Sequence, residues 1–281
     1  MMRPFKQVDV FSDQAGCGNP VAIVLDAVGL DDAALQRFAN WTNLSETTFL
    51  LPPAQPSADY RVRIFTTTTE LPFAGHPTLG SCHAWLEAGG RSHATDYVVQ
   101  ECAAGLIKIQ RDGARLAFAA PPLRKSGPID DALLERLVRG LGIARADVLG
   151  HQWLVNGPQW VGLRLRSAEQ VLALKPDYAA LNGIEFGVVG AYPAGSPYQF
   201  ELRAFAYSDG PVEDPVTGSL NAGVAQWLIG AGLAPERYIA SQGTVLGRAG
   251  RVYASRDADG QVWIGGVSQT LVDGQVQIDI A

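Results

Sequence analysis

Residues 70–80, Glu-Leu-Pro-Phe-Ala-Gly-His-Pro-Thr-Leu-Gly, combine a strand-like segment, a glycine turn and the start of a helix. Pro77 fits the first helical turn, because the N–H group that proline lacks would have no partner there. Apolar residues follow at helical spacing as far as Leu86, and the Gly-Gly pair at 89–90 is typical of a stop just past a helix C-terminus. The stretch therefore predicts a helix of about three turns that starts beside His76.

The start of this helix has the properties of an anion site. Its first turn leaves backbone N–H groups without intrahelical partners, and the helix dipole adds partial positive charge at the same end. Both features favour a bound carboxylate. We therefore expect a ligand to lie in front of Gly75 and His76.

The same design occurs a second time in residues 213–222, Glu-Asp-Pro-Val-Thr-Gly-Ser-Leu-Asn-Ala. When Gly75 is aligned with Gly218, both units have a helix of equal length that ends at a glycine. An Arg-x-Phe segment precedes each unit, at 63–65 and at 203–205. Two such units predict two pseudo-symmetric domains, since solenoids need at least three repeats. The alternative, that any two strand-turn-helix units look alike, stays open at this point.

The composition is that of an ordinary globular chain, with 47% hydrophobic and 18% charged residues among 281. This length is sufficient for two domains with well-buried cores. Lys and Arg number 22 against 28 Asp and Glu, which gives a net charge of −6. Nucleic acid is therefore not expected as a partner, because phosphate binding requires a basic surface.

Location and redox state follow from the same survey. The N-terminus runs directly into a strand pattern without the apolar segment of a secretory signal. No apolar run approaches the length needed to span a membrane, so we expect a cytoplasmic protein with no membrane partner. Cys17, Cys82 and Cys102 form no CxxC pair, which argues against a disulfide framework and against a structural zinc site. Cys82 is expected in the core.

The rest of the chain alternates short strand patterns with a few helices. Helices are expected at 31–41, 130–140, 176–182 and 219–231. A proline-containing linker at 120–128 marks the candidate domain boundary. It separates an N-terminal half, 1–122, which residues of the C-terminal tail can complete, from a C-terminal half, 123–281. Many short strands with one long helix per half predict an α+β fold.

Several common active-site patterns are absent from the sequence. No GxGxxG follows a strand, and the segment at 243–248 lacks the lysine and hydroxyl of a phosphate loop, so no nucleotide cofactor is expected. His76 and His83 are about 10 Å apart along one helix, too far to share a metal ion, and no metal is expected. Ser219 lies outside the GxSxG elbow of hydrolases, and hydrogen bonding to an anion is its better role.

Glu46, His76 and Asp214 remain as candidates for proton chemistry. If the two halves face each other, both helix starts can hold a substrate carboxylate or a developing enolate-like charge. Glu46 can then remove a proton and return it elsewhere, for which burial should raise its pKa. The alternative is that Glu46 is an ordinary solvated glutamate at the entrance of a strand.

Linked motifs along essentially the whole chain closely resemble the PhzF phenazine-biosynthesis family. They lie at 8–11, 18–22, 43–49, 70–80 and 213–219. The resemblance implies the diaminopimelate-epimerase-like fold, in which two pseudo-symmetric halves each wrap a mixed β-sheet around a central α-helix and the active site lies between them. It also implies an isomerase without a cofactor, acting on a small molecule, and a homodimer.

The resemblance assigns roles to individual residues. Glu46 matches the family's proton-shuttling glutamate, His76 its substrate-binding histidine and Asp214 its aspartate, and we expect these three to form the catalytic group. The residues expected to bind substrate are Asn19, Gly75, Gly218 and Ser219.

The leading hypothesis is therefore an isomerase that moves a proton on a small, cyclic, carboxylate-bearing molecule. One alternative is an epimerase or racemase of an amino-acid derivative. The glycines at 75 and 218 disfavour two-base epimerisation by cysteines, because epimerase relatives carry cysteines at these helix starts. The other alternative is a non-catalytic protein that binds a small carboxylate.

Overall fold

The computed structural model describes residues 1–206 and 213–278, and the chain divides into two compact units. Unit 1 comprises Met1–Ala119 and Gly265–Ala281, and unit 2 comprises Ala120–Ile264. The chain first passes from unit 1 to unit 2 between residues 119 and 120, close to the expected boundary at 122/123. The C-terminal tail returns to the N-terminal half.

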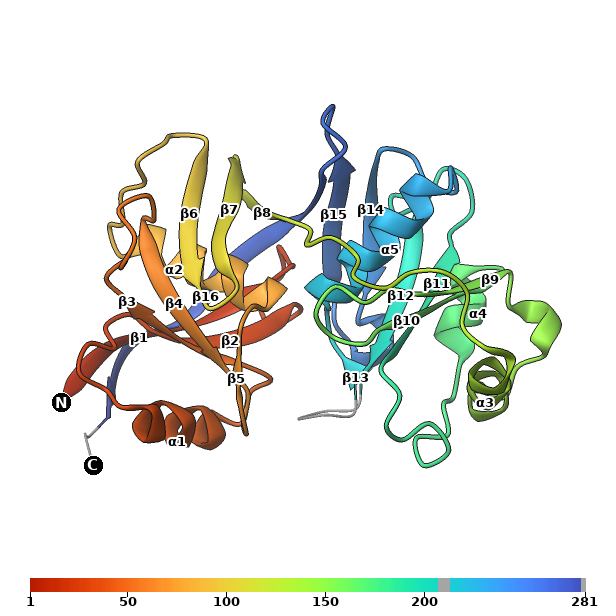
Figure 1. Cartoon of the computed structure of the whole chain (residues 1–281), viewed down its shortest axis with the longest axis horizontal. Helices are drawn as coiled ribbons and strands as arrows, with labels where there is room; N and C mark the ends of the chain where they lie inside the picture. The colour runs from red at the N-terminus through yellow and green to blue at the C-terminus, as the bar shows by residue number, and fades with distance from the viewer. Residues whose placement is uncertain (207–212, 279–281) are drawn as a thin grey trace. The chain divides into compact units, whose positions relative to one another are not determined.

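Unit 1 is a sheet of eight strands that closes on itself around helix α2 (Gly75–Glu87) (Figure 1). In order around the sheet the strands are β1 (Met2–Val10), β2 (Asn19–Val24), β3 (Thr47–Leu51), β4 (Tyr60–Phe65), β6 (Tyr97–Cys102), β7 (Gly105–Asp112), β8 (Arg115–Ala119) and β16 (Val262–Gln277). Antiparallel pairing of β16 with β1 closes the ring. Nine of the 13 residues of α2 are buried, as expected for a helix that strands enclose.

Helix α1 (Asp32–Thr42) packs against the strands of unit 1. It begins where the sequence predicts, because the Asp31 carboxylate accepts a hydrogen bond from the backbone N–H of Ala34 at 2.7 Å. Its Phe38 ring meets Phe49 edge to face, and Phe49 meets Phe65 in the same way. These rings form a small core of their own beside the helix.

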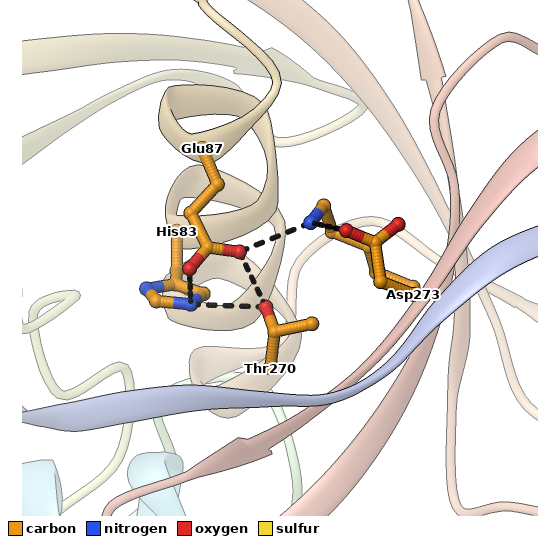
Figure 2. A network of polar contacts seen from close by, with 5 residues as sticks. His83, Glu87, Thr270 and Asp273 are labelled. Carbon is orange, nitrogen blue, oxygen red and sulfur yellow. Dashed lines mark hydrogen bonds and ion pairs between the residues drawn. The ribbon is translucent and has the colours of Figure 1, made fainter.

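A polar network holds the returning strand β16 against α2 and β1 (Figure 2). The Lys6 ammonium of β1 lies 2.7 Å from Asp273 of β16 and 3.1 Å from Glu87 of α2. The Thr270 hydroxyl of β16 donates to the same Glu87 carboxylate at 2.5 Å. His83 belongs to this network as well, since its Nε2 lies 3.3 Å from Glu87 Oε1. The C-terminal strand is therefore tied to unit 1 by side chains in addition to its backbone ladder.

Unit 2 is an open sheet with helices on both faces (Figure 1). Its strands run in the order β15 (Gly250–Arg256), β14 (Arg237–Gln242), β12 (Phe200–Phe205), β11 (Phe186–Ala191), β10 (Val161–Arg164) and β9 (Gly150–Trp153). Alternate residues of β10 and β11, such as Leu163 and Val188, share a core with α3 (Asp131–Leu141) and α4 (Ala168–Ala173). The intervening Gly162 and Gly187 approach α5 (Gly218–Gly230) on the other face.

The two units repeat one strand plan, which confirms the predicted duplication. The series β1-β2-β3-β4-β6-β7 and β9-β10-β11-β12-β14-β15 both alternate antiparallel and parallel pairings, beginning and ending with an antiparallel one. A two-residue strand, β5 (Glu70–Leu71) or β13 (Glu213–Asp214), pairs with β4 or β12 directly before the helix. Both central helices have 13 residues and start at the aligned glycines, Gly75 and Gly218.

Close packing of each central helix depends on a glycine in its second turn. A Cβ atom on Gly80 of α2 would lie 2.4 Å from Val21 Cγ1, and one on Gly223 of α5 would lie 2.9 Å from Leu154 Cβ. Both glycines occupy the sixth position of their helix. The missing side chains therefore allow each helix to approach its first strand pair.

The helix expected at 176–182 is wrong. The chain forms α4 earlier, at Ala168–Ala173, because the Ser167 hydroxyl caps that helix by accepting from the backbone N–H of Gln170. After α4, the Asp177 carboxylate accepts backbone N–H bonds from Ala179 and Ala180 and stabilises a turn. Leu181 of this segment shares a core with Leu134 and Leu137 of α3. Apolar periodicity alone does not distinguish such a packed turn from a helix.

Candidate active site

Glu46 and His76, both predicted to be catalytic, contact each other within unit 1. Glu46 directly precedes β3, and His76 is the second residue of α2. Glu46 Oε2 and His76 Nε2 are 3.4 Å apart, and the side chains are 16% and 6% exposed. Both of these atoms are buried. Glu46 is therefore not the solvated glutamate of the alternative interpretation.

Local contacts hold the entrance of β3 beside α2. Asn43 adopts a left-handed conformation (φ 55°) that ends α1 and turns the chain towards Glu46. The hydroxyl groups of Thr42 and Thr47 lie 2.7 Å apart on either side of this turn. Further along β3, Thr48 Oγ1 accepts a hydrogen bond from Ser81 of α2 at 2.9 Å. The strand and the helix are thus bonded directly, which keeps the contact between Glu46 and His76 short.

His76 is a neutral imidazole at physiological pH. Burial lowers its pKa to about 3, and a backbone hydrogen bond with Pro20 opposes this shift only partly. A neutral ring has one N–H and one lone pair, so it can donate from one nitrogen and accept at the other. His76 consequently places an uncharged ring beside the Glu46 carboxylate.

The other nitrogen of His76 faces Asn19. Asn19 Nδ2 lies 3.4 Å from His76 Nδ1, and Asn19 is only 1% exposed. The loop before Asn19 is fixed because the buried Asp9 carboxylate accepts from the backbone N–H of Gly18 at 2.9 Å. A side chain at Gly18 would lie 2.2 Å from the carbonyl oxygen of Val10. Asn19 is thus a rigid neighbour of the His76 ring.

Asp214, the third candidate, is the last residue of β13 in unit 2 and directly precedes the turn that leads into α5. The Thr217 hydroxyl donates to Asp214 Oδ2 at 2.5 Å. The fully buried Gln242 amide binds the turn from behind, donating to the carbonyl oxygen of Asp214 and accepting from the backbone N–H of Thr217. Asn221 of α5 also donates to Gln242, at 2.8 Å. Gln242 therefore sets the path of the chain between Asp214 and the start of α5.

Ser219, the second residue of α5, is held at its side chain and at its backbone. The Trp160 indole N–H donates to Ser219 Oγ at 2.9 Å, and Asn156 Nδ2 donates to the Ser219 carbonyl oxygen at 2.8 Å. Trp160 and Asn156 are buried, whereas Ser219 is half-buried. The half-buried hydroxyl lies at the N-terminal end of α5, where backbone N–H groups favour an anion.

The structure places the predicted residues in two groups, each within one unit. Unit 1 holds the group around the start of α2, and unit 2 holds the group around the start of α5. The first consists of Asn19, Glu46, Gly75 and His76, and the second of Asp214, Gly218 and Ser219. Sequence reasoning missed Asp9, Asn156 and Trp160 as supports of these groups. Of these three, only Asp9 lies in a motif noted in the sequence, at residues 8–11.

Two searches of the part of the chain that the structure describes gave negative results. Residues 1–206 and 213–278 contain no group of three or more His, Cys, Asp or Glu side chains arranged to hold a metal ion. The same residues form no helix with both the length and the apolar character needed to cross a membrane. Cys82 is fully buried, as predicted for a core residue.

Comparison with known proteins identifies the family. Residues 8–274 match the PhzC-PhzF family, described as phenazine biosynthesis-like protein. The chain belongs to this family. Antisense-enhancing sequence 1 of Schizosaccharomyces pombe is 36% identical, with 96% of this chain and 97% of that protein covered. Trans-2,3-dihydro-3-hydroxyanthranilate isomerase of Pseudomonas aeruginosa is 31% identical, with 92% of each chain covered. The chain described here is likewise an isomerase.

Solved structures give the same fold. A PhzF-family protein of Bacillus anthracis superposes with a TM-score of 0.83 at 23% identity and covers 99% of this chain and 100% of its own. A hydroxyproline epimerase of Agrobacterium vitis superposes with a TM-score of 0.59 at 13% identity over 98% of this chain and 92% of its own. The PhzC-PhzF chain therefore has the predicted α+β, diaminopimelate-epimerase-like fold.

Proposed function

We propose that this PhzC-PhzF protein moves a proton from one carbon of a small cyclic carboxylate to another, with Glu46 as the group that carries the proton. The contact between Glu46 Oε2 and His76 Nε2 is the observation that carries the proposal. It places the Nε2 atom of a neutral imidazole 3.4 Å from the oxygen of a half-buried carboxylate, close enough for a hydrogen bond to form when a substrate binds. The isomerase activity of the relative from Pseudomonas aeruginosa supports the reaction class.

The neutral state of His76 suits a base that must both accept and release a proton. A cationic imidazole would form a buried ion pair with the carboxylate and make Glu46 a weaker base. A neutral imidazole can donate a hydrogen bond to the carboxylate when Glu46 is ionised. Because the Asn19 amide nitrogen can only donate to His76 Nδ1, the ring proton lies on Nε2, towards Glu46. His76 can therefore stabilise the ionised form of Glu46 without carrying a positive charge.

The transferred proton keeps the reaction balanced without another reactant. Glu46 removes a proton from carbon, which leaves the electron pair delocalised over the substrate, and returns a proton to a different carbon. The product is then an isomer of the substrate with a shifted double bond. Backbone N–H groups at a helix start stabilise the negative charge that develops between the two steps.

Asp214, Gly218 and Ser219 are proposed to contribute to substrate binding. Their support is the fixed geometry of the turn before α5, where Gln242 and Trp160 hold the chain and the Ser219 hydroxyl. Asn19 is proposed to act by holding the His76 ring, because its 1% exposure leaves little surface for a ligand. We also propose a homodimer, which sedimentation equilibrium tests directly.

The test is an NMR assay in deuterated water with trans-2,3-dihydro-3-hydroxyanthranilate, the compound named for the relative. We expect the wild type to convert it, or another cyclic carboxylate of a test panel, with deuterium entering one carbon of the product. Glu46→Gln should fold normally and lose at least about 1,000-fold in kcat, because an amide cannot accept the proton. Glu135→Gln, an exposed change on α3, is the matched control and should keep full activity.

Two results would contradict the proposal. Undiminished turnover by Glu46→Gln would remove Glu46 from the chemistry. Deuterium incorporation with inversion at a single carbon, and no shift of a double bond, would favour the epimerase alternative. Tight binding of the panel compounds without any exchange of substrate hydrogen would favour the binding-protein alternative.

A further inference from the structure

The hydrogen bond from Trp160 constrains the direction of the Ser219 hydroxyl. A serine hydroxyl has one donor and two acceptor positions, whereas the indole N–H of tryptophan can only donate. Because Trp160 Nε1 lies 2.9 Å from Ser219 Oγ, it occupies an acceptor position of that oxygen. The Ser219 proton must therefore point away from Trp160, towards an acceptor elsewhere.

The indole is fixed in place by its backbone. The carbonyl oxygen of Trp160 accepts from the backbone N–H of Leu154 at 2.8 Å, and the next residue, Val161, donates to the carbonyl oxygen of Glu185 at 2.9 Å. Leu154 itself packs directly on Gly223 of α5, where a Cβ atom would approach it to 2.9 Å. Trp160 is 3% exposed. The donor thus belongs to a rigid hairpin that rests against α5.

The backbone of Ser219 is held as firmly as its side chain. Asn156, at the tip of the same hairpin, donates to the Ser219 carbonyl oxygen and is 6% exposed. One face of Ser219 is therefore occupied by two buried donors from the segment 156–160. The hydroxyl proton is directed towards the half-buried face of the residue.

We propose that Trp160 is a positioning residue, which orients the Ser219 hydroxyl so that it donates a hydrogen bond to a carboxylate oxygen of the substrate. The inference rests on the proposed function, because it requires Ser219 to contact a carboxylate. A preoriented donor binds an anion better than a free hydroxyl, since it pays no reorientation cost on binding. Trp160 does not itself touch the substrate.

A kinetic double-mutant cycle tests the coupling. Ser219→Ala should raise KM for the carboxylate substrate about 10-fold or more, because a hydrogen bond to a charged group is lost. Trp160→Phe should raise KM about 3- to 10-fold and leave kcat within about 2-fold, since the bond to the carboxylate is expected in ground and transition states alike. The double variant should be no worse than Ser219→Ala alone.

Trp263→Phe is the matched control. Trp263 lies in the same unit, is 7% exposed and donates its indole N–H to Asp257 at 2.7 Å, so the change removes a buried indole donor in the same way. It should leave KM unchanged. If Trp160 has a purely structural role, Trp160→Phe should instead behave like Trp263→Phe. Both variants would then have a lower thermal stability and a lower active fraction, with KM unchanged.

A binding measurement on chains with an intact Trp160 covers the case in which Trp160→Phe does not fold. The six tryptophans give six indole N–H signals in a ¹⁵N-labelled sample. Ser219→Ala should shift one of them strongly, and that signal marks Trp160. Anthranilate, a stable planar carboxylate, should shift the same signal when added to the wild type and should leave it unshifted in Ser219→Ala.

The outcomes separate this inference from the proposed function. A wild type that turns over, with additive effects of Trp160→Phe and Ser219→Ala, would overturn the positioning role and leave the isomerase standing. An indole signal that responds to Ser219→Ala but not to anthranilate would overturn it as well. If Glu46→Gln is as active as the wild type while the cycle remains non-additive in KM, the assignment of Glu46 fails and the positioning role stands.

Discussion

The first turns of α2 and α5 occupy equivalent places in the two units but offer different chemistry. The second residue is His76 in α2, where it contacts the Glu46 carboxylate at 3.4 Å. In α5 the second residue is Ser219, which contacts the Trp160 indole at 2.9 Å. Unit 1 thus holds a titratable pair, whereas unit 2 holds a directed hydroxyl. The duplicated backbone therefore determines the position of the functional residue. The identity of the side chain at that position determines its chemistry.

The ion pairs that precede the two central helices also differ between the units, in this case in burial. Arg63 binds Glu70 with two nitrogens in unit 1, and Arg203 binds Glu213 with two nitrogens in unit 2. Each guanidinium also lies 5.1 Å from the centre of the phenylalanine ring two residues later. The pair in unit 1 has side chains 19% and 35% exposed, but the pair in unit 2 has side chains 2% and 6% exposed. The two ion pairs have the same geometry, but loss of the buried pair should reduce the free energy of unfolding more than loss of the exposed pair.

Breaking the buried pair should have the largest effect on stability. Arg203→Met leaves the Glu213 carboxylate buried without its cation and also removes the hydrogen bond to the carbonyl oxygen of Leu174. We expect the free energy of unfolding to fall by about 3–5 kcal/mol. Arg63→Met, the equivalent change in unit 1, should cost about 1 kcal/mol or less, because water reaches that pair.

Urea denaturation of both variants, followed by circular dichroism, measures this difference. A double variant, Arg203→Met with Glu213→Leu, should recover much of the loss, since no buried charge remains. Equal losses for Arg63→Met and Arg203→Met would show that burial does not distinguish the two pairs.

Acid should destabilise the protein through His76, whose equivalent in α5 is Ser219, a residue that does not titrate in this pH range. The folded pKa of about 3 lies below the unfolded value near 6.5. Between these values the unfolded chain binds more protons, so the stability that neutral His76 contributes is present above pH 6.5 and is lost as the pH falls. The slope is at most about 1.4 kcal/mol per pH unit, or about 2 kcal/mol between pH 6.5 and 5.

Unfolding free energies at pH 7, 6 and 5 test this expectation. His76→Gln should flatten the pH dependence by that amount. Ser219→Ala, the change at the equivalent position of α5, removes no titratable side chain and should leave the pH dependence unchanged. A wild type and a His76→Gln variant with parallel pH profiles would contradict a neutral, buried His76.

Glycine substitutions in the central helices should have the smallest effect. Gly80→Ala would place a methyl group 2.4 Å from Val21 Cγ1, so the overpacking cost of about 1–3 kcal/mol should exceed the gain of about 1 kcal/mol in helix propensity. Gly230→Ala, at the exposed end of α5, meets no atom within 4 Å. This change should keep or raise the melting temperature. Calorimetry of both variants measures the two melting temperatures. A melting temperature for Gly80→Ala at or above that of the wild type would mean that α2 is not in tight contact with β2.

The helix starts and the duplication were predictable because their signals are local. The proline at position 77 and the glycines that follow each helix act through the backbone of their own segment, and the structure places both helices within one or two residues of the expected bounds. The segment at 176–182 shows the limit of such patterns. The Asp177 carboxylate stabilises a turn in that segment, and the Ser167 cap starts a helix earlier in the chain.

The candidate residues came from motifs, and the structure added their surroundings. Glu46 alone in sequence looks like any exposed glutamate, and only the fold places it against His76 with 16% of its side chain exposed. Trp160 carried no pattern that linked it to Ser219. Such pairs form between residues far apart in the chain, so no local spacing records them.

Local sequence patterns were sufficient to predict the two strand-turn-helix units and the glycines at their helix ends, and linked motifs were sufficient to predict the family. Three features became visible only in the folded chain: β16 returns to close the ring of unit 1, the pair Arg203–Glu213 is buried while Arg63–Glu70 is not, and Trp160 contacts Ser219. The physical reason is that backbone propensity acts within a few residues. Burial and hydrogen bonding between distant side chains depend on how the completed strands and helices pack.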